Sequence, residues 1–366
     1  MNYTDDKRIV MTLDAGGTNF VFTAMQAGEE IIEPLRMDSN ADDLDKCMNT
    51  LINGFQQVID KLDDKPVAIS FAFPGPADYP NGIIGDLQNL PAFRGGVALG
   101  PMLEEKFGIP VFINNDGDLY AYGEAIGGFL PEINRKLEEA GSPKRYKNLL
   151  GLTLGTGFGA GIVRDCELFI GDNSGAGEIW LLRDKLSPLL NIEEHASIRA
   201  VKRIYSEQLG IPFEEAPSPK EIFEIGKGEK EGNKDAAIKA FNEMAEAVGD
   251  AISNAITLID GLVVIGGGLS GASDLFLPRL IEEMNSKYTN KDGSTFNRLV
   301  ANVYNLENED EMNKFSEGSV KEIKVYGSDK IIKYDDEPRI GVGISKIGTS
   351  KAISLGAYAF SLNKLG

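Results

Sequence analysis

The stretch Val111-Phe-Ile-Asn-Asn-Asp116-Gly-Asp-Leu-Tyr-Ala-Tyr-Gly-Glu124 changes abruptly from an apolar run to polar residues, and a helical pattern follows. The apolar run predicts a strand that is buried on both faces. Asp116 would then emerge at the carboxyl end of that strand, where open α/β sheets bind their ligands. Asn115 can both donate and accept hydrogen bonds, as a neighbouring hydroxyl requires. Alternatively, residues 114–116 only cap the following helix, and taken alone the stretch supports both interpretations.

The composition narrows the class of protein. With 366 residues the chain is long enough for two domains, because single cores rarely grow past about 250 to 300 residues. Lys and Arg total 37 against 56 Asp and Glu, so the net charge of −19 repels nucleic-acid phosphates and anionic membranes. We therefore expect neither a nucleic-acid partner nor a membrane partner. An anionic substrate would need backbone N–H groups or a divalent cation to attract it.

The few cysteines and histidines exclude several kinds of site. Cys47 and Cys166 are the only cysteines, which is too few for a disulfide framework and is consistent with a reducing compartment. His195 is the only histidine, so neither an ordinary structural zinc site nor a His-based catalytic triad can be assembled. The first residues lack the apolar core of a signal peptide, and no segment approaches the roughly 18 apolar residues of a membrane span. We expect a cytoplasmic protein.

The first part of the chain predicts a mixed sheet covered by helices. The expected strands are 9–13, 20–25, 28–32, 67–73 and 111–114, and the expected helices are 42–62 and 101–108. The order β-β-β-α-β-α-β implies three antiparallel strands followed by two parallel ones. Residues 74–100 are expected to form a loop too polar for a core element.

The same order recurs downstream, which indicates an internal repeat. The expected strands are 149–154, 162–163, 168–170, 262–265 and 322–326, and the expected helices are 239–259, 272–284 and 349–362. Residues 302–336 are polar and charged, and we expect them to form an elaborated surface segment around the last strand.

Three glycine turns are candidates for phosphate binding. They are Asp14-Ala-Gly16-Gly17-Thr18-Asn19, Gly155-Thr156-Gly157-Phe-Gly159 and Gly266-Gly267-Gly268-Leu269-Ser270. Glycines let the backbone approach a ligand and point N–H groups at phosphate oxygens, although single glycine hairpins are commonplace in sheets. The chain has no Walker sequence. Residues 266–271 match the dinucleotide fingerprint, but the nearest suitable acid, Asp292, lies in a turn, so a dehydrogenase is a distant alternative.

Five motifs together resemble the ROK family of sugar kinases, within the actin, hexokinase and Hsp70 superfamily. They are Asp14-Ala-Gly-Gly-Thr, Asn115-Asp116, Gly155-Thr-Gly-Phe-Gly, Ala176-Gly-Glu178 and Ile265-Gly-Gly-Gly-Leu-Ser, in the family's order over nearly the whole chain. The resemblance implies an α/β, two-lobed actin-like ATPase fold of duplicated ribonuclease-H-like domains, with ATP and a hexose in the cleft. It implies a small N-terminal lobe over residues 1–125, a large lobe over 126–345, and a C-terminal helix within 346–366 that packs back on the small lobe.

The resemblance also implies roles for matching residues, with Asp116 as the base on the primary hydroxyl of the sugar. The implied sugar site comprises Gly75, Asn89, Asn115, Asp116, Glu178 and Glu193. The implied nucleotide site comprises Asp14, Gly16, Gly17, Thr18, Asn19, Gly155, Thr156, Gly157, Gly266, Gly267, Gly268 and Leu269. Asp14 would lie in the shell of a Mg²⁺ ion, through water. Members of the family usually form homodimers, so the resemblance also implies a homodimer.

The chain departs from the family pattern at one place. The family's Ala-Gly-Glu-Ile motif is usually followed by Gly-His and a cysteine cluster that together bind zinc, whereas Trp180 and Leu181 follow here and the cysteines are absent. We expect no zinc, packing by Trp180 and Leu181 in place of the metal, and His195 as a helix residue without a catalytic task. Glu193 would be the second sugar-binding carboxylate. In so acidic a chain, Glu178 and Glu193 could also be ordinary solvated acids.

The expected function is an ATP- and Mg²⁺-dependent hexokinase that phosphorylates the 6-hydroxyl of an aldohexose, with glucose as the first choice. An N-acetylhexosamine, mannose or fructose kinase with the same machinery is one alternative. A sugar-responsive transcription regulator is another, opposed by the charge and by the position of the first glycine turn at Asp14, which leaves no room for a preceding DNA-binding domain. A filament-forming or chaperone ATPase is a third, which would hydrolyse ATP regardless of sugar.

Overall fold

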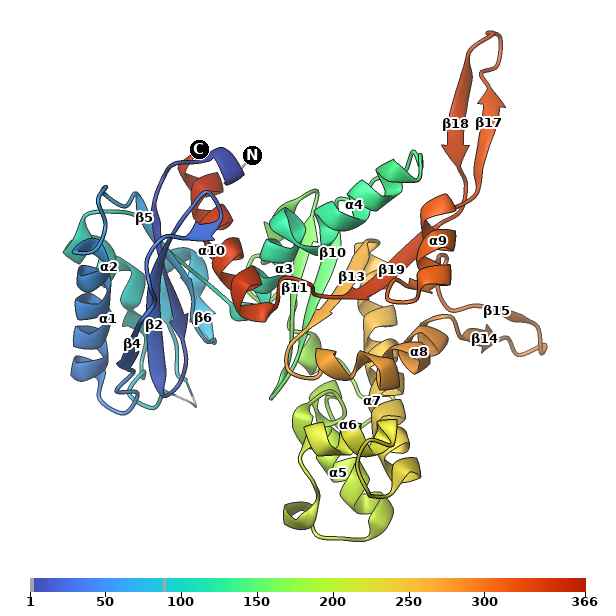
Figure 1. Cartoon of the computed structure of the whole chain (residues 1–366), viewed down its shortest axis with the longest axis horizontal. Coiled ribbons are helices and arrows are strands. Elements are labelled where there is room, and N and C mark those ends of the chain that lie inside the picture. Colours follow the sequence, from blue (N-terminus) through green and yellow to red (C-terminus); the bar gives the residue numbers. More distant parts are fainter. Residues whose placement is uncertain (1–2, 88–89) are drawn as a thin grey trace. The chain divides into compact units, whose positions relative to one another are not determined.

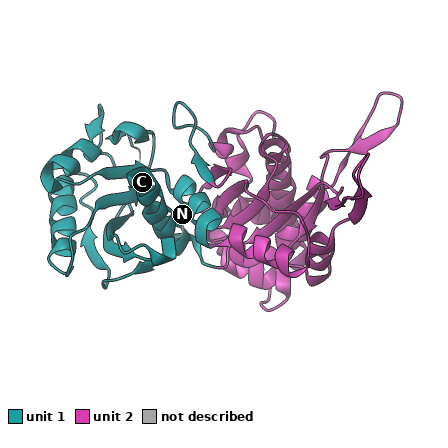
Figure 2. Ribbon diagram, turned by 90° about the horizontal axis from the view of Figure 1, so that it is seen from above, with its two compact units in different colours: residues 1–127, 167–177, 347–366 teal, residues 128–166, 178–346 magenta. Residues whose placement is uncertain are grey.

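The chain forms two compact units, each of the α/β class (Figure 2). The computed structural model describes residues 3–87 and 90–366. Unit 1 comprises the described residues of 1–127, 167–177 and 347–366, and unit 2 comprises 128–166 and 178–346. Across the described ranges, no helix combines the length and the apolarity that a bilayer crossing needs.

Unit 1 is built on a mixed sheet with the strand order β3-β2-β1-β5-β9, in which β4 also pairs with β2 (Figure 1). The strands are β1 (Val10–Ala15), β2 (Asn19–Gln26), β3 (Glu29–Glu30), β4 (Leu35–Asp38), β5 (Ala68–Ala72) and β9 (Val111–Asn114). β1 and β2 form an antiparallel hairpin, whereas β1, β5 and β9 run parallel. The carboxyl ends of these three parallel strands therefore meet at one edge of the sheet.

Helices cover both faces of this sheet. They are α1 (Leu44–Ile59), α2 (Leu99–Phe107), α3 (Asp116–Gly127) and α10 (Thr349–Leu365). On one side α1 buries Leu51, Phe55 and Val58 in an aromatic core that includes Phe22 and Phe71. On the other side α10 packs against α3, β5 and β1. The buried hydroxyl of Ser70 in β5 donates a hydrogen bond of 2.7 Å to the carbonyl oxygen of Ala357 in α10, which ties helix and sheet together.

One expectation for unit 1 is confirmed only in part, and another is wrong. The expected third strand at 28–32 is present but shortened to β3. A longer strand at this edge, β4, was not expected, because its sequence Leu-Arg-Met-Asp alternates apolar and polar residues over only four positions. Residues 74–100 also contribute to the core, through a small sheet of β6 (Ala77–Asp78), β7 (Ile83–Ile84) and β8 (Val97–Ala98). The buried apolar side chains of this stretch include Tyr79, Ile84, Leu87, Leu90 and Phe93. Most of them recur every third residue, but the glycines, prolines and polar residues between them do not suit a helix or a strand.

Unit 2 repeats the plan of unit 1, which confirms the predicted internal repeat. Five of its strands follow the order β11-β10-β13-β19-β16. They are β10 (Leu149–Leu154), β11 (Phe158–Arg164), β13 (Leu262–Gly266), β16 (Asn302–Asn305) and β19 (Arg339–Ile344). β10 and β11 form an antiparallel hairpin, and β10, β13, β19 and β16 run parallel. The short β12 (Glu167–Phe169) is grouped with unit 1, where it contacts α3.

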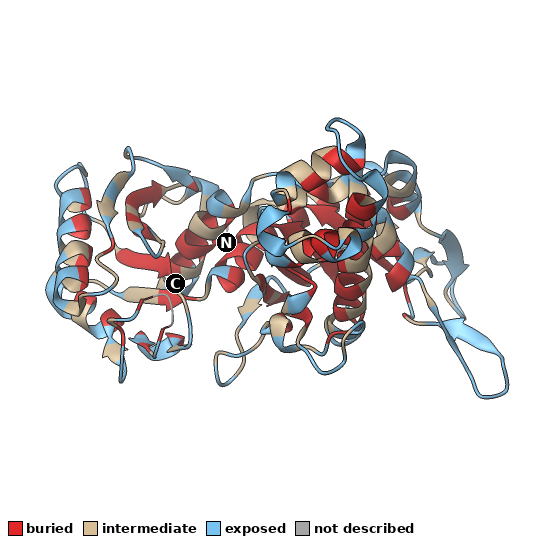
Figure 3. Cartoon of the chain, turned by 90° about the horizontal axis from the view of Figure 1, so that it is seen from below, coloured by how far each residue is buried: buried red, intermediate tan, exposed pale blue. Residues whose placement is uncertain are grey.

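The helices of unit 2 are α4 (Phe129–Glu139), α5 (Ile198–Leu209), α6 (Pro219–Lys227), α7 (Lys234–Ile259), α8 (Ser273–Met284) and α9 (Glu309–Glu317). α7 is the central one, because it packs against α8, α5 and α6. Its buried face includes Phe241, Met244, Val248 and Ile252, as the sequence spacing predicts. Residues of α7 and of the sheet form the core of unit 2, and Figure 3 shows the interior of the protein as largely buried.

The expected last strand of the sheet at 322–326 is wrong. Residues Val320–Lys324 (β17) pair with Ile331–Asp335 (β18) in a hairpin whose side chains are almost all exposed, and a second exposed hairpin joins β14 (Lys287–Thr289) to β15 (Thr295–Asn297) (Figures 1 and 3). The sheet instead contains β19, which is buried throughout. Its sequence Arg-Ile-Gly-Val-Gly-Ile hides the strand, because two glycines interrupt the apolar run.

Candidate functional site

The sheet edge of unit 1 gathers most of the residues that the sequence singles out there. The register aligns Asp14 in β1 with Ala72 in β5, and Ala72 with Asn114 in β9. The three segments that leave these strands therefore begin side by side. They carry the first glycine turn, Gly75 and the pair Asn115 and Asp116. Asn89 lies outside the described residues.

Asn115 and Asp116 are held by local hydrogen bonds at the start of α3. The N–H of Gly117 donates to Oδ1 of Asn115 at 2.8 Å and to Oδ1 of Asp116 at 2.9 Å. Nδ2 of Asn115 donates to Oη of Tyr79 at 3.4 Å, and Tyr79 in turn donates to the carbonyl of Phe73 at 2.9 Å. Asn115 thus caps the helix, as the alternative interpretation of this stretch predicts. Capping does not exclude a role in binding, because it also fixes the direction of both side chains.

The surroundings of Asp116 shift the pKa of its carboxyl. Asp116 is exposed to solvent, but many protein atoms surround its carboxyl group and reduce its hydration. This loss of hydration raises the pKa of the Asp116 carboxyl, and the negative charge of Asp14 raises it further, against the opposing hydrogen bond from Gly117. A carboxylate with a raised pKa accepts a proton more readily than an ordinary one.

The first glycine turn exposes backbone and one carboxylate at this edge. Gly16 N–H donates to the carbonyl of Asn19 at 3.0 Å, and Ser39 donates to the carbonyls of Gly17 and Thr18 at 2.6 and 2.9 Å. These bonds fix the turn and leave the side chain of Asp14 exposed. Carboxylate oxygens are the ligands that Mg²⁺ prefers, directly or through water, so the residues present fit this ion.

The sheet edge of unit 2 brings the other two glycine turns together. They follow the adjacent parallel strands β10 and β13, and Leu269 N–H donates to the carbonyl of Leu154 at 3.0 Å. Gly267 has a φ of 85°, and a Cβ there would lie 2.3 Å from the oxygen of Leu154, so only glycine fits. The start of α5 joins this edge, because Ile198 N–H donates to the carbonyl of Gly155 at 2.8 Å.

Glu193 lies against the second glycine turn, whereas Glu178 is more exposed. Oε2 of Glu193 accepts the N–H of Phe158 at 3.1 Å, and Oε1 lies 3.5 Å from Arg199. Glu193 is therefore held in place and is not merely solvated. Glu178 is exposed, and its Oε2 accepts the indole N–H of Trp180.

Two expectations about the missing zinc motif are wrong. Leu181 is 59% exposed and does not replace a metal by packing, although Trp180 is half-buried against the core. His195 is not a helix residue, since it follows the 3₁₀ turn Ile192–Glu194, and it is buried beside Asp184. Within the described ranges, no three His, Cys, Asp or Glu side chains are grouped to hold a metal ion.

Three residues around these sites carry no signal in the sequence. Tyr79 supports Asn115, Asp184 pairs with His195, and Lys185 contacts two core helices. None belongs to a motif, and each acts on a partner distant in the chain. Only burial would have identified Asp184, whose side chain is completely buried, and burial of a single polar residue cannot be read from a sequence.

Two sheets of one plan, each with a glycine turn after its first strand, define a two-lobed actin-like ATPase fold of the kind found in sugar kinases. The family comparison agrees with this class. The chain belongs to the ROK family, whose model matches residues 10–308, and it is an ATP-dependent sugar kinase. The predicted family and fold class are confirmed.

Individual relatives differ in the sugar that their names give. A solved structure of glucokinase from Parabacteroides distasonis is 57% identical, covers 99% of both chains and has a TM-score of 0.92. The N-acetyl-D-glucosamine kinase of Vibrio cholerae is 30% identical over 275 residues, which span 70% of this chain and 83% of that one. A ROK hexokinase from Thermus thermophilus, 19% identical with a TM-score of 0.67 over 98% of this chain and 100% of that one, shares the fold.

Proposed function

We propose that the chain transfers the γ-phosphoryl group of ATP to the 6-hydroxyl of glucose. The observation that carries the choice of sugar is the 57% identity over 99% of the chain to a protein named glucokinase. The second candidate is N-acetyl-D-glucosamine, because relatives of that name from Vibrio cholerae and Photobacterium profundum are 30% and 29% identical over 70% and 73% of the chain. Homodimerisation and a cytoplasmic location stay predictions.

In this proposal Asp116 is the general base. Its carboxylate accepts the proton of the 6-hydroxyl while the bond from that oxygen to the γ-phosphorus forms. The bond from the γ-phosphorus to the bridging oxygen breaks, and ADP leaves. The proton then passes to solvent, with which Asp116 is in contact. A positioned base contributes about 10² to 10⁴-fold to the rate.

The other residues bind and orient the reactants. Gly75, Asn115, Glu178 and Glu193 are proposed to contact the sugar hydroxyls, and Asn89 keeps the same predicted role. The nucleotide is proposed to lie against the glycine turns that follow β1, β10 and β13, whose N–H groups suit phosphate oxygens. Asp14 would hold Mg²⁺ through water, and the ion would neutralise charge on the phosphates.

A panel of sugars tests the substrate. We expect the highest kcat/KM for glucose in a coupled assay of ADP release, and values at least tenfold lower for N-acetylglucosamine, N-acetylmannosamine, mannose and fructose. Omitting sugar provides the control for ATP hydrolysis alone. A preference for N-acetylglucosamine would replace glucose by the second candidate, and sugar-independent hydrolysis would contradict a kinase.

The dependence of activity on pH tests the base. Because the pKa of Asp116 is raised, this carboxyl becomes protonated, and therefore inactive, at a higher pH than an ordinary Asp with its pKa of about 3.9. We expect kcat/KM for the sugar to be constant at neutral pH and to fall tenfold per pH unit below that raised pKa. A profile that stays flat down to about pH 4 would contradict the assignment.

A further inference from the structure

The segment 178–197 of unit 2 carries both candidate sugar-binding carboxylates of that unit. Glu178 begins the segment, and Glu193 lies in the 3₁₀ turn near its end. Between them the chain makes a loop that closes on itself, since Ile192 N–H donates to the carbonyl of Leu182 at 2.8 Å. A bridge between Arg183 and Asn191 continues this closure. The base of the loop therefore sets where the two carboxylates lie.

Apolar packing does not explain how the outer part of this loop is held. Leu186, Leu189 and Leu190 are 37%, 100% and 50% exposed. Loops with few buried apolar contacts open easily. The strong contacts of the loop are instead made by two consecutive polar residues, Asp184 and Lys185.

Asp184 connects the base of the loop to the turn that carries Glu193. Its side chain is completely buried, with Oδ1 accepting the N–H of Leu186 at 2.8 Å and Oδ2 paired with Nδ1 of His195. A buried carboxylate costs several kcal/mol unless it is paired, so this geometry depends on His195. His195 is two residues from Glu193, so the pair restrains the backbone that carries Glu193.

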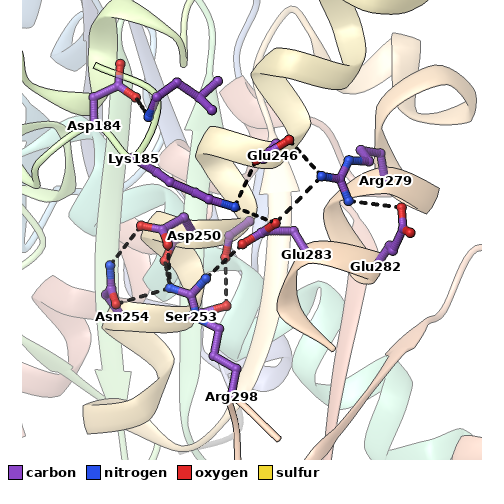
Figure 4. Close-up of polar contacts among 12 residues, drawn as sticks. Asp184, Lys185, Glu246, Asp250, Ser253, Asn254, Arg279, Glu282, Glu283 and Arg298 are labelled. Carbon is purple, nitrogen blue, oxygen red and sulfur yellow. Dashed lines mark hydrogen bonds and ion pairs between the residues drawn. The ribbon is translucent and has the colours of Figure 1, made fainter. Parts of the chain in front are cut away.

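Lys185 connects the loop to the core helices of unit 2. Its Nζ lies 2.9 Å from Oε1 of Glu246 in α7 and 2.8 Å from Oε2 of Glu283 in α8 (Figure 4). Glu246 also pairs with Arg279 at 2.7 Å, and Glu283 also pairs with Arg298 at 2.9 Å. Each glutamate therefore has an arginine partner besides the lysine. The side chain of Glu283 is 5% exposed and that of Lys185 is 36% exposed, so this partly buried ion pair is screened by salt less than a fully exposed one.

We propose that Asp184, Lys185 and His195 are positioning residues for the sugar, which anchor the loop so that Glu178 and Glu193 hold a fixed geometry. The inference rests on the proposed role of these two carboxylates in sugar binding. Asp184 anchors the loop to its own carboxyl-terminal end, and Lys185 anchors it to α7 and α8. Polar contacts therefore hold this loop in place, whereas apolar packing holds the core helices of unit 2.

Lys185→Met is the sharpest test, because it keeps the length of the side chain and leaves each glutamate with an arginine. We expect the KM for the sugar to rise about tenfold, with kcat and the KM for ATP changed less than threefold. Contacts that orient the ligands of metal sites typically contribute 10 to 100-fold, and we expect contacts that orient sugar-binding carboxylates to lie at the lower end of that range. Lys185→Arg should restore the KM. The matched control is Lys239→Met, a lysine of α7 whose own partners are Gln208 and Glu243.

Two further measurements separate the possible outcomes. Trp180 is the only tryptophan and lies inside the segment, so its fluorescence reports sugar binding without catalysis. Glu193→Gln serves as the reference. If Glu193→Gln weakens sugar binding while Lys185→Met and His195→Phe do not, the anchoring inference is wrong and the proposed site stands. If Glu193→Gln leaves sugar binding unchanged, the proposed site fails. If Lys185→Met lowers kcat and raises both KM values together, the role is structural only and the inference is overturned.

Discussion

Asp116→Asn is expected to lower kcat by about 10² to 10⁴-fold, because the amide cannot accept the proton of the attacking hydroxyl at neutral pH. The substitution keeps the size of the side chain and an oxygen that can accept the N–H of Gly117, so the start of α3 is preserved. Asn115 also continues to cap the helix. We therefore expect ATP binding, sugar binding and the unfolding temperature to change little.

The measurements that check this result are steady-state kinetics, sugar titration by the fluorescence of Trp180 and thermal unfolding. The matched control is Glu105→Gln, which removes an exposed carboxylate from α2 in the same unit. Retention of more than a tenth of the wild-type kcat in Asp116→Asn would contradict its role as base. An equal loss in the control would show that net charge and not position is responsible.

The glycine turns and the strands before them could be predicted because their signal is local. β10 occupies the predicted residues Leu149–Leu154, since four leucines within six residues, between a polar stretch and a glycine turn, favour a buried strand. The same locality makes Asp116 a candidate, because a polar residue directly after such a run must lie at a sheet edge. Candidate residues of this kind can be recognised from about a dozen neighbouring residues.

The features that escaped prediction depend on partners far along the chain. β19 is a central strand, but Gly341 and Gly343 interrupt its apolar run, and the register with β13 and β16 determines its place. Lys185 resembles any surface lysine until Glu246 and Glu283, which lie on two other helices, are brought beside it. Such pairs leave no periodic pattern in a single sequence.

The contact between α3 and α10 gives the second large effect, expected for Gly356→Ala. A Cβ at position 356 would lie 2.0 Å from the carbonyl oxygen of Leu119, and one at Gly123 would lie 1.9 Å from that of Ala352. Each helix therefore inserts a glycine against the backbone of the other. Backbone atoms cannot turn aside as a flexible side chain can, so any larger residue must push the helices apart.

Replacing glycine by alanine within a helix normally stabilises the helix by about 1 kcal/mol. A loss of stability in Gly356→Ala would therefore be due to the close contact between the helices. We expect Gly356→Ala to lower the free energy of unfolding by about 3 kcal/mol, the upper range for overpacking, as measured by urea denaturation. Because Asp116 begins α3, kcat should fall as well. Ser354→Ala, a half-buried position on the same helix, is the control and should be neutral or stabilising. Unchanged stability in Gly356→Ala would mean that α3 and α10 are farther apart in solution than this contact requires.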